Sequence, residues 1–179
     1  MVILEFFTEV DFQTLIDWNN DLSERFLFQW AGHEFEYPLT KEQLEKYLDG
    51  ANRPDGNRFI YRVIDSNSRR VIGHLQISGR DQDHGSAQIT RVLVGEQSDR
   101  GKGYGRQIIH AACQLIFDQW GMHRASLRVF DFNRAAISCY EKAGFQMEAL
   151  FREARKMNGQ YFDLCEMSLL DHEWCALKY

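Results

Sequence analysis

Three alternate glycines and three basic residues lie together in residues 100–106, Arg-Gly-Lys-Gly-Tyr-Gly-Arg, a composition that suits phosphate binding. Glycine adopts left-handed backbone angles and lets the main chain approach an anion closely. The residues that follow have the apolar spacing of a helix, whose start offers unpaired N–H groups and the positive end of its dipole. We therefore expect a phosphate-bearing cofactor at this loop, bound by Arg100, Gly101, Lys102, Gly103, Tyr104, Gly105 and Arg106.

A second candidate is the short helical pattern that begins at Asn133 and ends at Gly144. Asn is a favoured N-cap, and Gly is favoured just after a helix. Asn133 and Tyr140 are separated by about 10 Å along the axis and nearly two turns, so both side chains lie on one face. They can meet one extended ligand, and we expect the chemistry near Tyr140. The alternative is that Tyr140 is a core aromatic beside Ile137 and Phe145.

Two other phosphate-binding patterns are excluded. A dinucleotide-binding turn has the pattern GxGxxG, and no glycine follows Gly101-x-Gly103 or Gly103-x-Gly105 at the third position that this pattern requires. A meander of strands, instead of a βαβ unit, also precedes the loop. The GxxxxGK[ST] pattern is absent from the sequence.

The elements that must position these motifs alternate between strand and helix patterns. Alternating apolar residues predict strands, and apolar residues three and four apart predict helices. The predicted order is a strand at 3–7, helices at 11–18, 23–30 and 41–48, strands at 58–64, 71–78 and 87–94, a helix from 104 to 120, a strand at 126–130, a helix at 133–143 and a hairpin at 145–153 and 161–170. We expect an α/β (α+β) fold: a mixed, mostly antiparallel sheet of about seven strands flanked by helices, in one domain over residues 1–179.

Composition and charge indicate which kinds of ligand the protein can bind. The net charge of −5 makes nucleic acid a poor partner. Residues 1–55 hold 12 acidic and 4 basic residues, whereas the remainder holds 14 acidic and 17 basic ones. This asymmetry suggests two ligands of opposite charge, although solvated helix faces explain part of it.

The sequence also predicts where the protein works. The first residues lack the basic start of a signal peptide, and no apolar stretch approaches the roughly 20 residues of a membrane span. The four cysteines are scattered without CxxC pairs, and the six histidines show no metal-ligand spacing. We expect a cytoplasmic protein with reduced thiols, no membrane partner and no metal.

From residue 92 to residue 145 the chain resembles the GNAT superfamily of N-acetyltransferases, which transfer acetyl from acetyl-CoA to an amine. In that family the Arg-x-x-Gly-x-Gly signature, here Arg100, Gly103 and Gly105, binds the pyrophosphate of CoA. The resemblance also implies that the preceding strand pairs through its backbone with the pantetheine arm; its residues here are Val92, Leu93 and Val94.

The resemblance extends to the second motif. It implies that Asn133 contacts the cofactor and that Tyr140 donates a proton to the departing thiolate. A phenol with a pKa of about 10 beside a thiol with a pKa of about 8.5 can protonate or hydrogen-bond that sulfur, although the pKa difference does not itself drive full transfer.

The acceptor nitrogen must lose its proton before it attacks, so a base is needed. N-terminal protein acetylases of this family carry Glu five residues before the Asn, where this sequence has Arg128, which cannot serve as a base. The remaining candidates are Glu34, Glu36, Gln88 as a water-positioner, His74 and Glu166, and no spacing argument chooses among them. Glu34, Glu36 and Gln88 are also the residues that we expect to contact the acceptor.

The final hairpin looks like the branch that contains RimJ/RimL-type ribosomal-protein acetylases and spermidine acetyltransferases. That branch implies a protein N-terminus or a polyamine as acceptor, and an acidic N-terminal portion would suit a polycation. We expect an acetyl-CoA-dependent enzyme that acts on a primary amine. The alternatives are a catalytically silent CoA-binding regulatory protein and a pure interaction module. An exposed strand edge could also pair with a second copy, which would give a homodimer.

Overall fold

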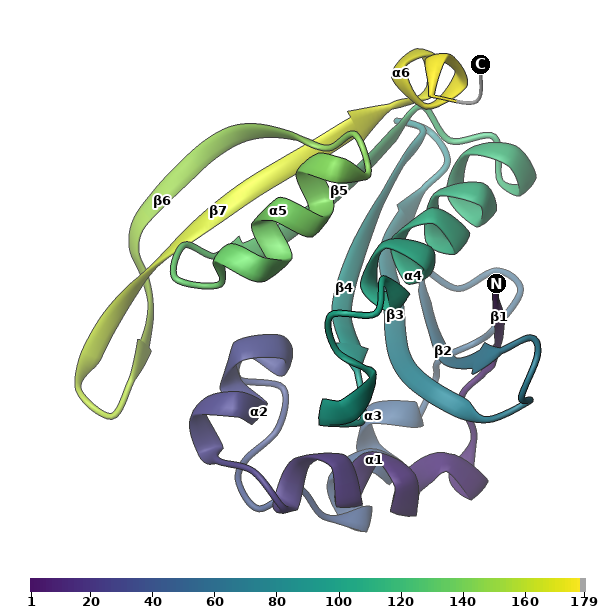
Figure 1. The fold of residues 1–179 in the computed structure, drawn as a ribbon. Coiled ribbons are helices and arrows are strands. Elements are labelled where there is room, and N and C mark those ends of the chain that lie inside the picture. Colours follow the sequence, from purple (N-terminus) through teal and green to yellow (C-terminus); the bar gives the residue numbers. More distant parts are fainter. Residues whose placement is uncertain (178–179) are drawn as a thin grey trace.

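The computed structural model describes residues 1–177, which form one seven-stranded sheet in the order β1-β2-β3-β4-β5-β7-β6 (Figure 1). All neighbouring strands are antiparallel except β4 and β5, which are parallel. The prediction of a mixed, mostly antiparallel sheet is confirmed. The strands are β1 (Val2–Phe6), β2 (Arg58–Asp65), β3 (Val71–Asp81), β4 (Ser86–Val94), β5 (Arg124–Phe130), β6 (Gln146–Met157) and β7 (Gln160–Leu170).

Helices flank this sheet (Figure 1). The α-helices are α1 (Phe12–Asn20), α2 (Glu24–Ala31), α3 (Lys41–Leu48), α4 (Tyr104–Cys113), α5 (Arg134–Lys142) and α6 (Asp171–Ala176). A π-helical segment, Gln114–Gln119, continues α4. Within residues 1–177 every helix is too short or too polar to cross a membrane.

Each face of the sheet is covered by its own hydrophobic cluster. On β2, Phe59, Tyr61 and Val63 belong to the cluster that includes the buried residues of α4. Ile60, which lies between Phe59 and Tyr61 in the strand, belongs to the cluster formed by α1, α2 and α3. Successive strand residues point to opposite faces, so β2 is an almost continuous apolar run because both faces are buried.

The central opening arises where β4 and β5 part. They pair only over residues 86–89 and 124–127, and beyond this they diverge in a V, with α2 near the open end (Figure 1). A bulge also interrupts the pairing of β4 with β3 between Thr90 and Leu93. Arg91, inside the bulge, has a φ of 52°, and bulges of this kind re-aim side chains.

The C-terminal segment differs most from the sequence prediction. The final hairpin is longer than expected, since β6 runs to Met157, and α6 was not predicted. Helix α6 has six residues, too few to show a period, and depends on tertiary contacts. Its Trp174 lies 5.0 Å from the His110 ring and 5.9 Å from the Phe117 ring, and Glu173 accepts a 2.8 Å hydrogen bond from Leu170 N.

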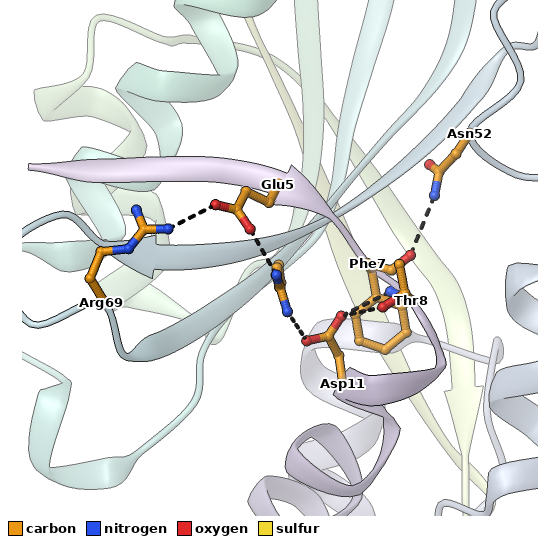
Figure 2. A network of polar contacts seen from close by, with 7 residues as sticks. Glu5, Phe7, Thr8, Asp11, Asn52 and Arg69 are labelled. Atoms are coloured by element: carbon orange, nitrogen blue, oxygen red, sulfur yellow. Dashed lines mark hydrogen bonds and ion pairs between the residues drawn. The ribbon is translucent and has the colours of Figure 1, made fainter.

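A polar network joins β1 to the start of α1 (Figure 2). The Arg62 guanidinium donates to Glu5 at 2.7 Å and to Asp11 at 2.9 Å, and Arg69 donates to Glu5 at 3.2 Å. Asp11 also accepts from Thr8 N at 2.9 Å and is only 4% exposed. Part of the acidic N-terminal charge therefore stabilises the fold and is not available to a ligand.

Candidate active site

A cavity of about 600 Å³ occupies the opening between the end of β4, α5 and the loop of residues 100–106, which we call the glycine loop; we call this cavity the cofactor cavity. It brings together most of the residues predicted to bind the cofactor. These are Val92, Leu93, Val94, Arg100, Gly101, Gly103, Gly105, Arg106 and Asn133, together with Tyr140. Residues of α2 and of the loop, which sequence reasoning did not identify, complete the lining: Phe26, Gln29, Trp30 and Asp99 among them.

Two predicted cofactor residues do not line this cavity. Lys102 is exposed, with Nζ 3.7 Å from Asp99 Oδ1. Tyr104 packs against the hydrophobic cluster of α4. Both lie beside residues that line the cavity, but they do not line it themselves.

The glycine loop has the geometry of an anion cradle. Gly101 and Gly103 have φ values of 77° and 84°, and a Cβ at either would meet no atom within 4 Å. The first hydrogen bond of α4 runs from Gln107 N to Gly103 O at 3.2 Å. The preceding N–H groups therefore have no partner within the helix and form the positive end of its dipole. This arrangement fits the diphosphate of CoA.

Arg100 fastens the loop to the end of β4. Its Nε donates to Val94 O at 3.2 Å, and its guanidinium donates to Gly95 O at 2.9 Å. The guanidinium carbon lies 4.4 Å from the centre of the Phe26 ring, which links α2 to the same place. Arg100 thus supplies positive charge to the cavity while holding its walls together.

Tyr140 lies both in the hydrophobic core and at the cofactor cavity. Its ring is 9% exposed and lies in the hydrophobic core, 6.5 Å from Phe145, yet it also lines the cofactor cavity. Burial raises the pKa of Tyr140, so the phenol keeps its proton at neutral pH. Asn133 Oδ1 caps α5 by accepting from Ala136 N at 3.3 Å. Because the carbonyl oxygen makes the cap, the Asn133 NH₂ group is left to donate to a ligand.

A second cavity of about 570 Å³ adjoins the first, and Gln29 and Trp30 line both. We call it the arginine cleft because three arginines line it. Its lining residues come from α2 and the following loop, from β4, and from β5, β6 and β7: Gln29, Trp30, Ala31, Gly32, His33, Glu34, Gln88, Thr90, Arg91, Arg128, Val129, Phe130, Arg155 and Leu164.

Two of the three residues predicted for the acceptor lie here. Glu34 and Gln88 line the arginine cleft, and Glu34 is ion-paired with Arg91. Glu36 does not line it; its side chain is exposed, and its backbone N donates to Gln43 Oε1 at 2.8 Å. Of the 12 acidic residues among residues 1–55, Glu34 alone lines the cleft.

The other two base candidates lie outside both cavities. His74 is 1% exposed and bonded through Nε2 to the Tyr47 hydroxyl at 3.1 Å. Burial lowers the pKa of His74 to about 3, so it is neutral at physiological pH and a very weak base. Glu166 lies on β7 opposite Arg128, and its carboxylate is 2.9 Å from Arg128 Nε. Among residues 1–177, no three His, Cys, Asp or Glu side chains are grouped to hold a metal ion.

Comparison with known proteins agrees with this geometry. The model of the acetyltransferase (GNAT) family matches residues 17–145. The spermidine N(1)-acetyltransferase of Vibrio cholerae is 28% identical over 141 residues, which cover 78% of this chain and 79% of that protein. The aminoglycoside N(6')-acetyltransferase type 1 of Klebsiella pneumoniae is 27% identical over 157 residues, which cover 82% of this chain and 75% of that protein.

The fold is shared with solved structures as well. The crystal structure of the Vibrio cholerae spermidine N-acetyltransferase in complex with CoA and spermine has a TM-score of 0.82 and 23% sequence identity, covering 97% of this chain and 98% of that chain. The matching fold, the family match and the related sequences agree. The chain therefore belongs to the GNAT family of acetyltransferases, and it transfers an acetyl group from acetyl-CoA to an amine.

Proposed function

We propose that the cofactor cavity holds acetyl-CoA, that the arginine cleft holds the acceptor amine, and that the two react where the cavities adjoin. The observation that carries this assignment is the continuity of the cavities. Gln29 and Trp30 line both, and on β4 the lining passes from Arg91 in the cleft to Val92 in the cavity.

The chain offers three groups of contacts to acetyl-CoA. The main-chain N–H groups at residues 101–106 receive the diphosphate, with Arg100 and Arg106 adding charge. The edge of β4 that faces β5 has no strand partner after Ile89, so it can pair with the amides of pantetheine as it would with an added strand. Asn133 presents its NH₂ group to the same ligand.

Tyr140 and Glu34 are the proposed proton-transfer residues. Acetyl-CoA supplies the acetyl group: the amine nitrogen forms a C–N bond to the carbonyl carbon while the C–S bond breaks. Tyr140 is protonated at neutral pH, so its hydroxyl can donate a hydrogen bond to the departing sulfur. Burial also makes the phenol a weaker acid, so its proton passes only as negative charge develops on that sulfur. Glu34 is the one carboxylate among the residues that line the cleft, and we assign to it the proton released by the amine, directly or through one water.

A melting experiment and a turnover assay test this function together. CoA at a hundred times its dissociation constant should stabilise the protein by about 2.7 kcal/mol, seen as a rise in melting temperature. Acetyl-CoA with a panel of primary amines should release free thiol. A melting shift without turnover of any amine would instead favour the silent CoA-binding protein, and no shift at all would contradict the cofactor assignment.

Three further expectations complete the proposal. Residues 1–179 act as one N-acetyltransferase domain, supported by the single sheet that runs from β1 to β7. The protein works in the cytoplasm, supported by its four free cysteines. A homodimer remains a prediction; β6 is an edge strand with exposed Met147, Leu150 and Phe151, and sedimentation would test it.

A further inference from the structure

The arginine cleft carries an excess of positive charge. Its lining holds Arg91, Arg128 and Arg155 but one carboxylate, Glu34. Glu34 is already paired with Arg91, and Arg128 is paired with Glu166, which lies outside the lining. Arg155 donates to Ala154 O at 2.8 Å, and no described carboxylate lies within ion-pair distance of it. One full positive charge therefore faces the cleft without an anion.

The phosphates of CoA do not account for this charge. The glycine loop, Arg100 and Arg106 line the cofactor cavity, whereas Arg91, Arg128 and Arg155 do not. A polyamine does not account for it either. A chain of ammonium groups needs carboxylates along its length, and like charges brought together in a cleft cost binding energy.

We propose that the acceptor amine also bears a carboxylate, as a free amino acid or an acidic peptide N-terminus does. Its ammonium group lies at Glu34, and its carboxylate is bound by Arg155 with Arg128. Guanidinium groups suit this role because their planar donors match the two oxygens of a carboxylate. Trp30, Phe130 and Leu164 give the same cleft apolar walls for the rest of the molecule. The inference rests on the proposed function, which places the acceptor in this cleft.

The test compares matched acceptors. The twenty protein amino acids are assayed with acetyl-CoA beside their α-carboxamides, which keep the amine and lose the α-carboxylate. Spermidine is assayed as well, together with C-terminally amidated peptides that begin with Asp, Glu or an uncharged residue. We expect the best carboxylate-bearing acceptor to exceed its matched amide or uncharged peptide about ten- to hundredfold in kcat/KM. Whichever set of acceptors has the higher kcat/KM, the free amino acids or the acidic peptides, identifies the source of the carboxylate.

A substitution locates the contact. Arg155→Gln should lower kcat/KM for that acceptor at least tenfold through a higher KM, with kcat and the CoA-induced melting shift unchanged, and should leave the amide unaffected. Arg152→Gln is the matched control, because Arg152 is exposed on the same strand and does not line the cleft.

Three results would overturn the inference: spermidine as the best acceptor, an amide equal to its acid, or turnover of other amines with no turnover of any carboxylate-bearing amine. Each leaves the CoA site intact. Failure of the proposed function is separate, since it would appear as no turnover of any amine or as an absent CoA-induced melting shift.

Discussion

The Trp18 indole lies so close to Gly95 that a Cβ added there would be 2.2 Å from the ring atom Cε2. The indole is held in place by a 3.2 Å hydrogen bond from its Nε1 to Glu96. Gly95 directly follows β4 on the way to the glycine loop, and its carbonyl accepts a hydrogen bond from Arg100 at 2.9 Å. Helix α1 therefore contacts, through the Trp18 ring, the backbone that leads from β4 to the glycine loop.

Gly95→Ala should destabilise the protein by about 1–3 kcal/mol, because a methyl group forced against a packed ring displaces backbone or ring. Since the displaced backbone leads into the loop, CoA affinity should fall as well. Urea unfolding and CoA titration measure the two effects. In a Trp18→Leu background, Gly95→Ala should lower the free energy of unfolding by less than it does in the wild type. If the effects of the two substitutions simply added, direct contact between the two residues would be contradicted.

Gly103→Val should weaken CoA binding by conformational strain. The φ of 84° is unfavourable for a β-branched residue, whereas the Cβ itself would meet no protein atom within 4 Å. The loop would then relax from the geometry that directs its N–H groups to phosphate, and we expect at least a tenfold loss of CoA affinity by calorimetry. Gly159→Val is the control. It has a φ of 80°, equally open surroundings and a place in the β6–β7 turn, so normal CoA affinity is expected there.

Much of the cofactor cavity could be predicted because its motifs are local. Gly103 lies at the start of one helix and Asn133 at the start of another, and a helix start is recognisable from a few residues. The motif also predicts Lys102 and Tyr104 at the cofactor, but the direction of a side chain at a helix start depends on what packs around it. Loop membership alone does not settle that direction.

The arginine cleft could not be predicted in the same way. Arg155 reaches it from a strand whose placement depends on tertiary packing. The strand pattern also breaks near Glu153, which has a φ of 52° in an irregular stretch where β6 carries extra residues against β7. A side chain can change faces at such a bulge, so the period of two no longer predicts its direction.

Tyr140→Phe should lower kcat about 10²–10⁴-fold, the usual range for loss of a general acid. CoA affinity should change little, because the substitution removes a hydroxyl that bonds to no other described residue and keeps the ring in the core. Thiol release and CoA titration, run on the same preparation, measure these quantities. Undiminished turnover would remove Tyr140 from the reaction and leave it a core aromatic.

Arg62→Met should destabilise the fold by about 3 kcal/mol, because it leaves the buried carboxylate of Asp11 without its cation (Figure 2). Arg69→Met provides the comparison. That guanidinium is 61% exposed and contacts Glu5 alone, so its loss should cost at most about 1 kcal/mol. Equal losses in urea unfolding would show that the network does not depend on Asp11.

His74 should make the protein less stable as the pH falls below neutrality. Burial lowers its pKa to about 3 in the folded state, against about 6.5 when unfolded. Between these values the unfolded chain binds a proton that the folded one does not, so this contribution to stability is fully present above pH 6.5 and declines as the pH drops toward 3. The decline is at most about 1.4 kcal/mol per pH unit.

His74→Gln isolates this contribution, since the amide can keep a hydrogen bond to Tyr47 and does not titrate. The variant should lose less stability than the wild type between pH 6.5 and pH 5 in urea unfolding. Its pH profile of kcat/KM should match that of the wild type, because a neutral imidazole outside both cavities takes no part in proton transfer. A profile that lost its acidic limb in the variant would return His74 to the list of bases and displace Glu34 from that role.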